Sequence, residues 1–278
     1  MSLKITTLCE NTAGRLGCIA EWGLSMLVET EDITLLFDTG RHDAALLNAD
    51  TLGIDIRKID MIVLSHGHHD HTGGLRCFLQ RLNGIEIVAH PDIWDPKYTK
   101  RPYEDREAYC GIPFAREELE SLGGSFTLAT QPVALSEGVV TTGEIDMTVP
   151  YEAVESTMLL KEGNTFRRDP LADDLSLVIT TDEGLVVILG CAHRGAINTI
   201  RHAQKITGEE RVHAVIGGTH LYPASVDRVE RTIEELIALD VQRVGLSHCS
   251  GFYASMRVAE ALQDRFFLNN AGTQITLP

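Results

Sequence analysis

A run of histidines followed by paired glycines, at positions 65–74, constrains this chain more than any other stretch. Residues 66–71 read His-Gly-His-His-Asp-His, so four histidines and one aspartate lie within six consecutive positions. An apolar, β-branched run at residues 59–64 precedes them and predicts a buried strand. Gly73 and Gly74 follow, and then come apolar residues at helical spacing, which are Leu75, Phe78, Leu79 and Leu82. The histidines are therefore expected in a sharp turn between a strand and a helix.

The spacing within this run suits metal binding. Imidazole and carboxylate groups are ordinary ligands of zinc, iron and manganese. Alternate residues of a short extended turn project the same way, so His66 and His68 are expected to hold one metal. Asp70 and His71, where the chain curls into the helix, are expected to reach a second, and Gly67 leaves room for this approach. The alternative is a solvated histidine-rich loop, but the internal position, the strand–helix context and the interleaved aspartate favour a metal site.

Three further histidines occupy similar places in the second half of the chain. In each case a β-rich run ends in small residues, a histidine follows and a helical pattern begins; they are His193, His220 and His248. In layered α/β folds, the carboxyl ends of strands at one sheet edge form a common cleft. A single histidine of this kind is more often a hydrogen-bonded structural group than a ligand. The repetition nevertheless predicts that these side chains and the run at 65–74 converge on one cleft.

Asp38 has two interpretations. It ends an expected strand at residues 33–37 and is followed by Thr39 and Gly40. A carboxylate at this point is typical of an N-cap for the helix expected at 42–52. It is equally typical of a group that orients a metal-binding histidine through a hydrogen bond. The residue chemistry alone does not decide between these two roles.

The charge balance and the cysteines narrow the function classes. The chain has 278 residues, with 40 acidic and 24 basic side chains and a formal charge of −16. This balance disfavours nucleic acid as a partner, because phosphate binding relies on clustered Lys and Arg. The six cysteines form no Cys-x-x-Cys pair, so reduced thiols in a cytoplasmic protein are expected. The sequence shows no membrane-spanning run or signal segment, and residues 1–278 are expected to form one domain.

A lid-like insertion is expected at about 91–124, with an irregular stretch from 92 to about 111 and a short helix at 117–122. Long irregular insertions in a compact domain are usually functional loops. Its aromatic and cationic side chains, Trp94, Arg101 and Arg106 among them, would suit a flat anionic ligand. Arg194, at the head of a later helix, would strengthen an anion site. The alternative is that the aromatic side chains only anchor the loop.

Five motifs together resemble the metallo-β-lactamase superfamily. Two are general to the superfamily, namely Phe37-Asp38-Thr39-Gly40 and the run at 65–74. Three are similar to the branch that contains dihydropterin-methyl-ribofuranosylaminobenzene 5′-phosphate synthase-like proteins: GCAHRGAIN (190–198), GGTHL (217–221) and SHCSG (247–251). The resemblance extends from about residue 3 to the end of the chain. It implies an α/β fold, a four-layer αββα sandwich with a two-metal cleft at one edge.

The resemblance also implies ligand roles. Matched residue by residue, the ligands are His66 and His68 at the first metal, and Asp70, His71 and His248 at the second. Asp38 matches the strand-end aspartate that supports the metal loop. The chain departs from the family pattern after the hairpin expected at 175–189, because Cys191 stands where a bridging aspartate would be.

No histidine precedes that hairpin in residues 171–174, where the family usually has one. We therefore expect His193 as a ligand in its place. Cys191 is expected either as a thiolate ligand or as a small core residue. Asp173 and Asp174 are further candidates.

The sequence leaves three functions open. The first is metal-dependent hydrolysis of a small anionic aromatic or phosphorylated substrate, with one or two zinc ions, or with iron or manganese. Asp70 would then help to position the attacking hydroxide, and His220 would be a proton donor or oxyanion contact, unless it is a structural group. The second is the non-hydrolytic condensation of the synthase-like branch, and the third is a metal-binding sensor without turnover. The oligomeric state is not specified.

Overall fold

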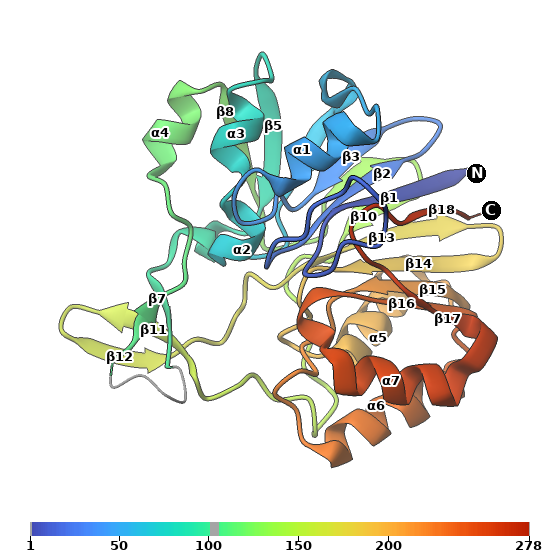
Figure 1. The fold of residues 1–278 in the computed structure, drawn as a ribbon. Helices are drawn as coiled ribbons and strands as arrows, with labels where there is room; N and C mark the ends of the chain where they lie inside the picture. Colours follow the sequence, from blue (N-terminus) through green and yellow to red (C-terminus); the bar gives the residue numbers. More distant parts are fainter. Residues whose placement is uncertain (1, 101–105, 278) are drawn as a thin grey trace.

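The structure, a computed structural model, describes residues 2–100 and 106–277 and is built around two seven-stranded sheets (Figure 1). The strands of the first sheet are Leu3–Cys9 (β1), Ser25–Glu29 (β2), Thr34–Phe37 (β3), Met61–Val63 (β4), Ile85–Ala89 (β5), Gly124–Leu128 (β8) and Gln274–Leu277 (β18). Those of the second are Ala134–Ser136 (β9), Val139–Thr141 (β10), Ser176–Thr181 (β13), Gly184–Leu189 (β14), Val212–Gly217 (β15), Arg243–Leu246 (β16) and Phe266–Leu268 (β17). Their orders are β18-β1-β2-β3-β4-β5-β8 and β17-β16-β15-β14-β13-β10-β9.

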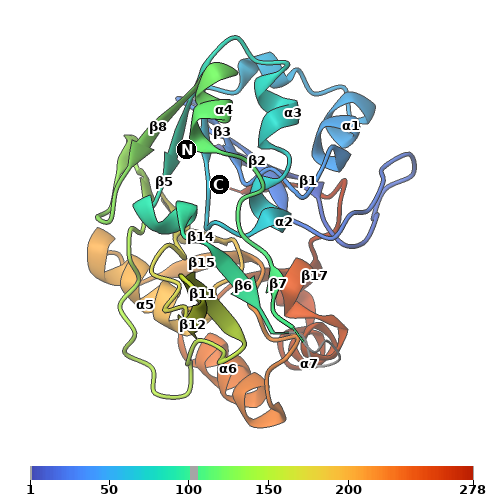
Figure 2. The ribbon, with the colours of Figure 1, turned by 90° about the vertical axis from the view of Figure 1, so that its left-hand side faces the viewer.

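Helices cover the outer face of each sheet (Figures 1 and 2). Over the first sheet lie Ala44–Thr51 (α1), Leu75–Leu79 (α3) and Arg116–Ser121 (α4). Over the second lie Ala196–Thr207 (α5), Val226–Ala238 (α6) and Phe252–Leu262 (α7). Single-turn elements are His69–Thr72 (α2) and the 3₁₀ turns Ile56–Lys58 (η1), Pro91–Trp94 (η2), His248–Ser250 (η3) and Gln263–Arg265 (η4). Among the described residues, no helix has the length and apolarity needed to cross a membrane.

Three apolar clusters fill the three interfaces between these layers. In β2, Leu27 packs under the helices of the first sheet, whereas Met26 and Val28 face the second sheet. Successive side chains of a strand point to opposite faces, and here both faces are buried. The third cluster lies between the second sheet and its helices. The expected four-layer αββα sandwich is therefore confirmed.

The parallel strands place the chemistry-bearing turns at one edge of the sandwich. β3 pairs in parallel with β4, and β15 pairs in parallel with both β14 and β16. Parallel neighbours end at the same edge, so the segments that follow these five strands meet there. Those segments carry Asp38, the histidine turn, Cys191, His220 and His248.

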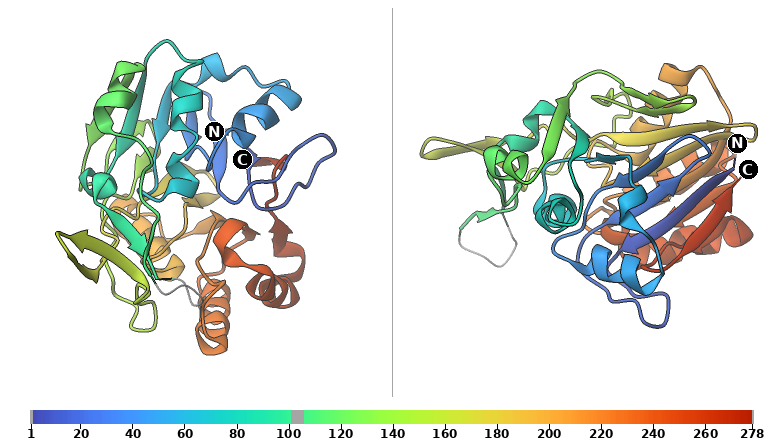
Figure 3. Two further views of the ribbon diagram at one scale, coloured as in Figure 1. Left: turned by 60° about the vertical axis from the view of Figure 1, so that its left-hand side comes forward. Right: turned by 90° about the horizontal axis from the view of Figure 1, so that it is seen from above.

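A third, four-stranded sheet stands apart from the sandwich (Figure 3). Its strands are Lys97–Thr99 (β6), Ala108–Tyr109 (β7), Met158–Glu162 (β11) and Thr165–Arg168 (β12), in the order β12-β11-β6-β7. Within the insertion expected at 91–124, the stretch expected to be irregular carries β6 and β7, whereas the helix expected at 117–122 is α4, Arg116–Ser121. The hairpin of β11 and β12 has no buried alternation to mark it, since every residue of β12 is exposed.

Candidate metal centre

The histidine turn begins directly after β4 and runs into α2. Gly67, in the middle of this turn, packs against the backbone of η2. A Cβ atom on Gly67 would lie 2.4 Å from the Ile93 carbonyl oxygen, so a larger residue would displace the turn. The close approach that requires glycine is therefore between two backbone segments. The sequence interpretation had assigned it to a metal instead.

Side chains from three separate segments converge at this edge in two donor groups that share no residue. The first consists of His66, His68 and His193, and the second of Asp70, His71 and His248. Within each group the potential ligand atoms all lie within 4.8 Å of one another. The structure thus brings together the six histidine and aspartate side chains that were expected as ligands.

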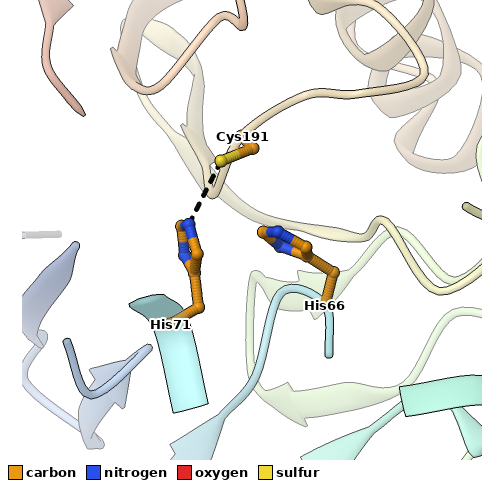
Figure 4. A group of neighbouring side chains, drawn as sticks. All are labelled: His66, His71 and Cys191. Atoms are coloured by element: carbon orange, nitrogen blue, oxygen red, sulfur yellow. Dashed lines mark hydrogen bonds between the residues drawn. The ribbon is translucent and has the colours of Figure 1, made fainter. Parts of the chain in front are cut away.

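Cys191 lies between the two groups. Its Sγ is 3.1 Å from His71 Nε2, and His66 stands beside both residues (Figure 4). Of the five donor groups that the described residues could form, three contain Cys191. One of them includes His66 and His71, the second includes His248 and Cys249, and the third includes His193 and His220. Cys191 therefore stands within reach of residues from both donor groups.

The first donor group fits a metal ion in its protonation and in its unused atoms. Burial lowers the pKa of His66, His68 and His193, so these imidazoles are neutral, as metal ligands must be. The Nε2 atoms of His68 and His193 are buried without a hydrogen-bond partner among the described residues. A buried polar atom left unpaired costs about 1–3 kcal/mol. A metal held by these nitrogens would remove that cost.

Asp38 orients two of these histidines. Its carboxylate accepts hydrogen bonds from the Ser65 backbone N–H and hydroxyl, both at 2.7 Å, and lies 2.6 Å from His71 Nδ1. Ser65 Oγ is in turn 2.9 Å from His66 Nδ1. Burial opposes a charge on His71, but the Asp38 carboxylate outweighs it and raises the pKa of His71 to about 9. Since α1 begins only at Ala44, Asp38 caps no helix, and the orienting role is the one the structure shows.

Two residues that the sequence interpretation missed hold His248. The backbone N–H of His248 donates to Glu10 Oε1 at 2.6 Å, and its Nδ1 lies 2.9 Å from Asn11 Oδ1. Burial raises the pKa of Glu10. Glu10 and Asn11 appear in the sequence only as part of a polar loop, about 240 positions before their partner, so no local pattern relates them to the site.

The backbone is strained at four of the turns that build the site. Asp38, Ala192, His220 and His248 have φ values of 59°, 50°, 48° and 52°. This left-handed region costs a residue with a side chain about 1–3 kcal/mol, and such residues concentrate at functional sites. Packing of the surrounding layers therefore holds the ligand-bearing turns in conformations that they would not adopt alone.

His220 and Cys249 form a second polar pair beside the donor groups. His220 Nε2 lies 3.0 Å from Glu155 Oε2, and the His220 backbone N–H donates to Cys249 Sγ at 3.3 Å. Burial disfavours the charged His220, but Cys249 and Glu155 raise its pKa to about 10. Burial likewise opposes ionisation of Cys249, but hydrogen bonds from Cys191 and His220 hold its pKa low. Sequence reasoning assigned no role to Cys249 or Glu155; the only signal was the position of Cys249 directly after His248.

Of the four residues expected to bind substrate, the three that the structure describes do not line the cavity beside the donor groups. Trp94 packs against Phe126 at 5.2 Å between ring centroids, in the first helical layer. Arg194 donates to the carbonyl oxygens of Ile145 and Pro170 and so joins two loops. Arg106 is exposed and is not among the residues that line the cavity, and Arg101 lies outside the described residues. For Trp94, anchoring is therefore the role that the structure supports.

Asp173 and Asp174 also have structural partners. Asp173 accepts a hydrogen bond from the Gly67 N–H at 2.8 Å and pairs with Lys97. Asp174 accepts from the Arg194 N–H at 2.8 Å, and burial raises its pKa to about 7. Neither carboxylate belongs to a donor group among the described residues.

Replacement of Cys191 by alanine is expected to reduce the metal content while that of a Cys18→Ala control stays unchanged. Cys191 is the one cysteine that joins both donor groups, whereas Cys18 lies in none of them. With cobalt in place of the native metal, the thiolate-to-metal absorption band should also disappear in Cys191→Ala. An unchanged metal content together with an unchanged spectrum would make Cys191 a packing residue.

A four-layer αββα sandwich with histidines and an aspartate gathered at the strand ends defines a protein of the metallo-β-lactamase type. The family model of the metallo-beta-lactamase superfamily matches residues 23–248, and the chain belongs to this superfamily. Over 281 aligned residues it is 36% identical to the 7,8-dihydropterin-6-methyl-4-(beta-D-ribofuranosyl)-aminobenzene-5′-phosphate synthase of Methanocaldococcus jannaschii, covering 98% of this chain and 95% of the synthase. The resemblance to the synthase-like branch is thereby confirmed.

Solved structures show the same fold. The crystal structure of Tm1679, described as a metal-dependent hydrolase of the beta-lactamase superfamily, superposes with a TM-score of 0.85 at 28% identity and 98% coverage of both chains. Zn²⁺-bound PqqB from Methylobacterium extorquens has a TM-score of 0.56 at 12% identity, with 99% of this chain and 100% of PqqB covered. At that identity, PqqB shows the shared fold alone.

Proposed function

We propose that this protein is a metal-dependent hydrolase acting on a small molecule, with one or two metal ions of which zinc is the first expectation. The observation that carries the proposal is the pair of donor groups joined by Cys191 at the floor of a cavity of about 480 Å³. The similarity to Tm1679 supports the hydrolase class. The formal charge of −16 favours a small-molecule substrate over nucleic acid.

Metal ions bound here would supply Lewis acidity and would lower the pKa of water near neutrality. The protein's own side chains would orient the reacting groups. Burial raises the pKa of Asp70, but the hydrogen bond from His248 and the charge of His71 outweigh it, so Asp70 is a carboxylate. Its Oδ2 lies 3.1 Å from Trp22 Nε1 and 3.3 Å from His248 Nε2, which orients the group for positioning a nucleophile.

We assign His220 the role of proton donor or oxyanion contact. It lines the cavity, its Nε2 pairs with Glu155, and its Nδ1 is buried without a partner among the described residues. Glu155 therefore favours the charged ring, and the free Nδ1–H is available to a leaving group or to a developing negative charge.

A second candidate is a non-hydrolytic condensation of the kind named for the synthase of M. jannaschii. The 36% identity along nearly the whole of both chains favours it. The same donor groups would then activate a substrate oxygen without water as the nucleophile. A metal-binding sensor would show metal binding without either reaction.

Zinc-loaded protein is expected to hydrolyse at least one member of a panel of aryl phosphates, aryl esters and lactones. His220→Gln should lower kcat by about 100-fold or more, as expected for loss of a general acid, with little change in KM. The alkaline limb of the kcat–pH profile should disappear with it. His213→Gln, on the strand β15 that leads to the His220 turn but outside the cavity, is the matched control. Full metal loading without turnover of any panel member would shift support to the condensation or the sensor.

A further inference from the structure

The cavity above the donor groups shares its lining with two neighbouring hollows. Arg41 and His69 also line a hollow of about 550 Å³. Trp22, Tyr222 and His248 also line another of about 350 Å³. The residues at these two boundaries differ in chemistry, since one set is cationic and polar and the other is aromatic. A ligand that extends from the metal centre to both boundaries would contact both the cationic and the aromatic residues.

Arg41 is the cation at the first boundary that has no partner. Among the described residues, no hydrogen bond or ion pair involves its guanidinium, although its backbone N–H donates to Glu21 at 3.0 Å. Its neighbours in the same hollow are engaged: His42 pairs with Glu21 at 3.0 Å, and Arg76 donates to Glu118 at 2.7 Å. In a chain of net charge −16, an unpaired guanidinium beside the metal pocket is a local anion site.

Trp22 and Tyr222 present aromatic surface at the other boundary. Trp22 is 50% and Tyr222 72% exposed, so large rings face solvent at the entrance to the cavity. Trp22 is held in place, because its Nε1 donates to Asp70 and its ring lies 5.5 Å from that of His248. Exposed aromatic surface next to a cavity is typical of a ligand-binding surface.

We propose that Arg41, Trp22 and Tyr222 are the specificity-determining residues of this site, and that they bind a substrate carrying both an aromatic ring and an anionic group. The anion pairs with Arg41 and the ring lies against Trp22 and Tyr222, all of which line the same cavity as the donor groups. This inference rests on the proposed function. It assigns substrate recognition to residues of the sandwich and not to the insertion expected at 91–124.

Binding of 1-naphthyl phosphate, measured by quenching of tryptophan fluorescence, tests the assignment. The chain has two tryptophans, and Trp94 is packed against Phe126, so a Trp94→Phe background makes the signal report Trp22 alone. In that background Arg41→Gln should weaken binding about tenfold or more, because a charge-assisted hydrogen bond is lost. Arg76→Gln, whose guanidinium is already engaged by Glu118, should bind as the parent does.

The aromatic part of the proposal has its own measurement. Tyr222→Ala should weaken 1-naphthyl phosphate binding about threefold or more, which is the scale of one ring contact. Its affinity for inorganic phosphate, measured by competition, should not change. Neutral 1-naphthol should bind more weakly than 1-naphthyl phosphate and should be insensitive to Arg41→Gln. Equal affinities of the parent and Arg41→Gln for 1-naphthyl phosphate would overturn the assignment of Arg41.

The same titrations are made on zinc-loaded protein and after chelation of the metal. Because Arg41 belongs to no donor group, its effect should persist in both forms. An Arg41 effect in a zinc-loaded protein that hydrolyses nothing would contradict the proposed hydrolase and leave the recognition intact. Hydrolysis of an aryl phosphate without any Arg41 or Tyr222 effect would contradict the recognition alone.

Discussion

Substitution of His68 by alanine is expected to abolish tight metal binding, with a loss of affinity above about 100-fold. His68 contributes a buried, neutral imidazole whose Nε2 has no partner among the described residues. Metal at 1,000 times its dissociation constant stabilises a folded protein by about 4 kcal/mol. The zinc-dependent rise in the melting temperature should therefore disappear in His68→Ala. Metal content by mass spectrometry on untagged protein gives the direct measurement.

His69→Ala is the matched control for this experiment. His69 is the next residue in the same turn, but its Nδ1 lies 3.0 Å from the Cys110 carbonyl oxygen and it belongs to no donor group. Its metal content should equal that of the parent. Metal-free His68→Ala should unfold close to the metal-free parent, because the lost side chain leaves no charged partner unpaired. Parent-like zinc binding by His68→Ala would remove His68 from the ligand set.

Lys97→Met is expected to lower the free energy of unfolding by about 3–5 kcal/mol. The Lys97 side chain is 1% exposed, and its ammonium group lies 3.0 Å from Asp169 and 2.8 Å from Asp173. Burial opposes its charge, but the two carboxylates raise its pKa. Removing the ammonium leaves two buried carboxylates without a counter-ion. Urea denaturation of metal-free protein measures the loss without a contribution from bound metal.

Lys97→Met should also disturb the histidine turn, because Asp173 accepts a hydrogen bond from the Gly67 backbone N–H. Lys161→Met serves as the control. Lys161 is an exposed residue of β11, beside β6, and its substitution should change stability by no more than about 0.5 kcal/mol. Adding Asp169→Asn to Lys97→Met should restore part of the loss, since one unpaired charge is removed. A Lys97→Met protein as stable as the parent would show that water solvates the two carboxylates.

Sequence patterns located most of the sandwich because burial repeats along its strands and helices. The hairpin expected at 175–189 is formed by β13 and β14, and the strand expected at 33–37 is β3, Thr34–Phe37. The hairpin of β11 and β12 was not predicted, because exposed strands carry no alternation of apolar and polar residues. The metal-binding roles of the converging side chains stay predictions, to be tested as above.

The sequence by itself determined the histidine turn, the strand-end histidines and the family to which the chain belongs, since each of these is a local arrangement of residue types. Only the tertiary structure decided which groups meet. It places Glu10 against His248, 238 positions away, and Cys191 against His71, 120 positions away. It also pairs Lys97 with Asp173, and it places Arg41, Trp22 and Tyr222 in the cavity lining, from which Arg106 and Arg194 are absent. Local spacing records how each segment folds, whereas these contacts depend on how parallel strand ends align when the two sheets pack.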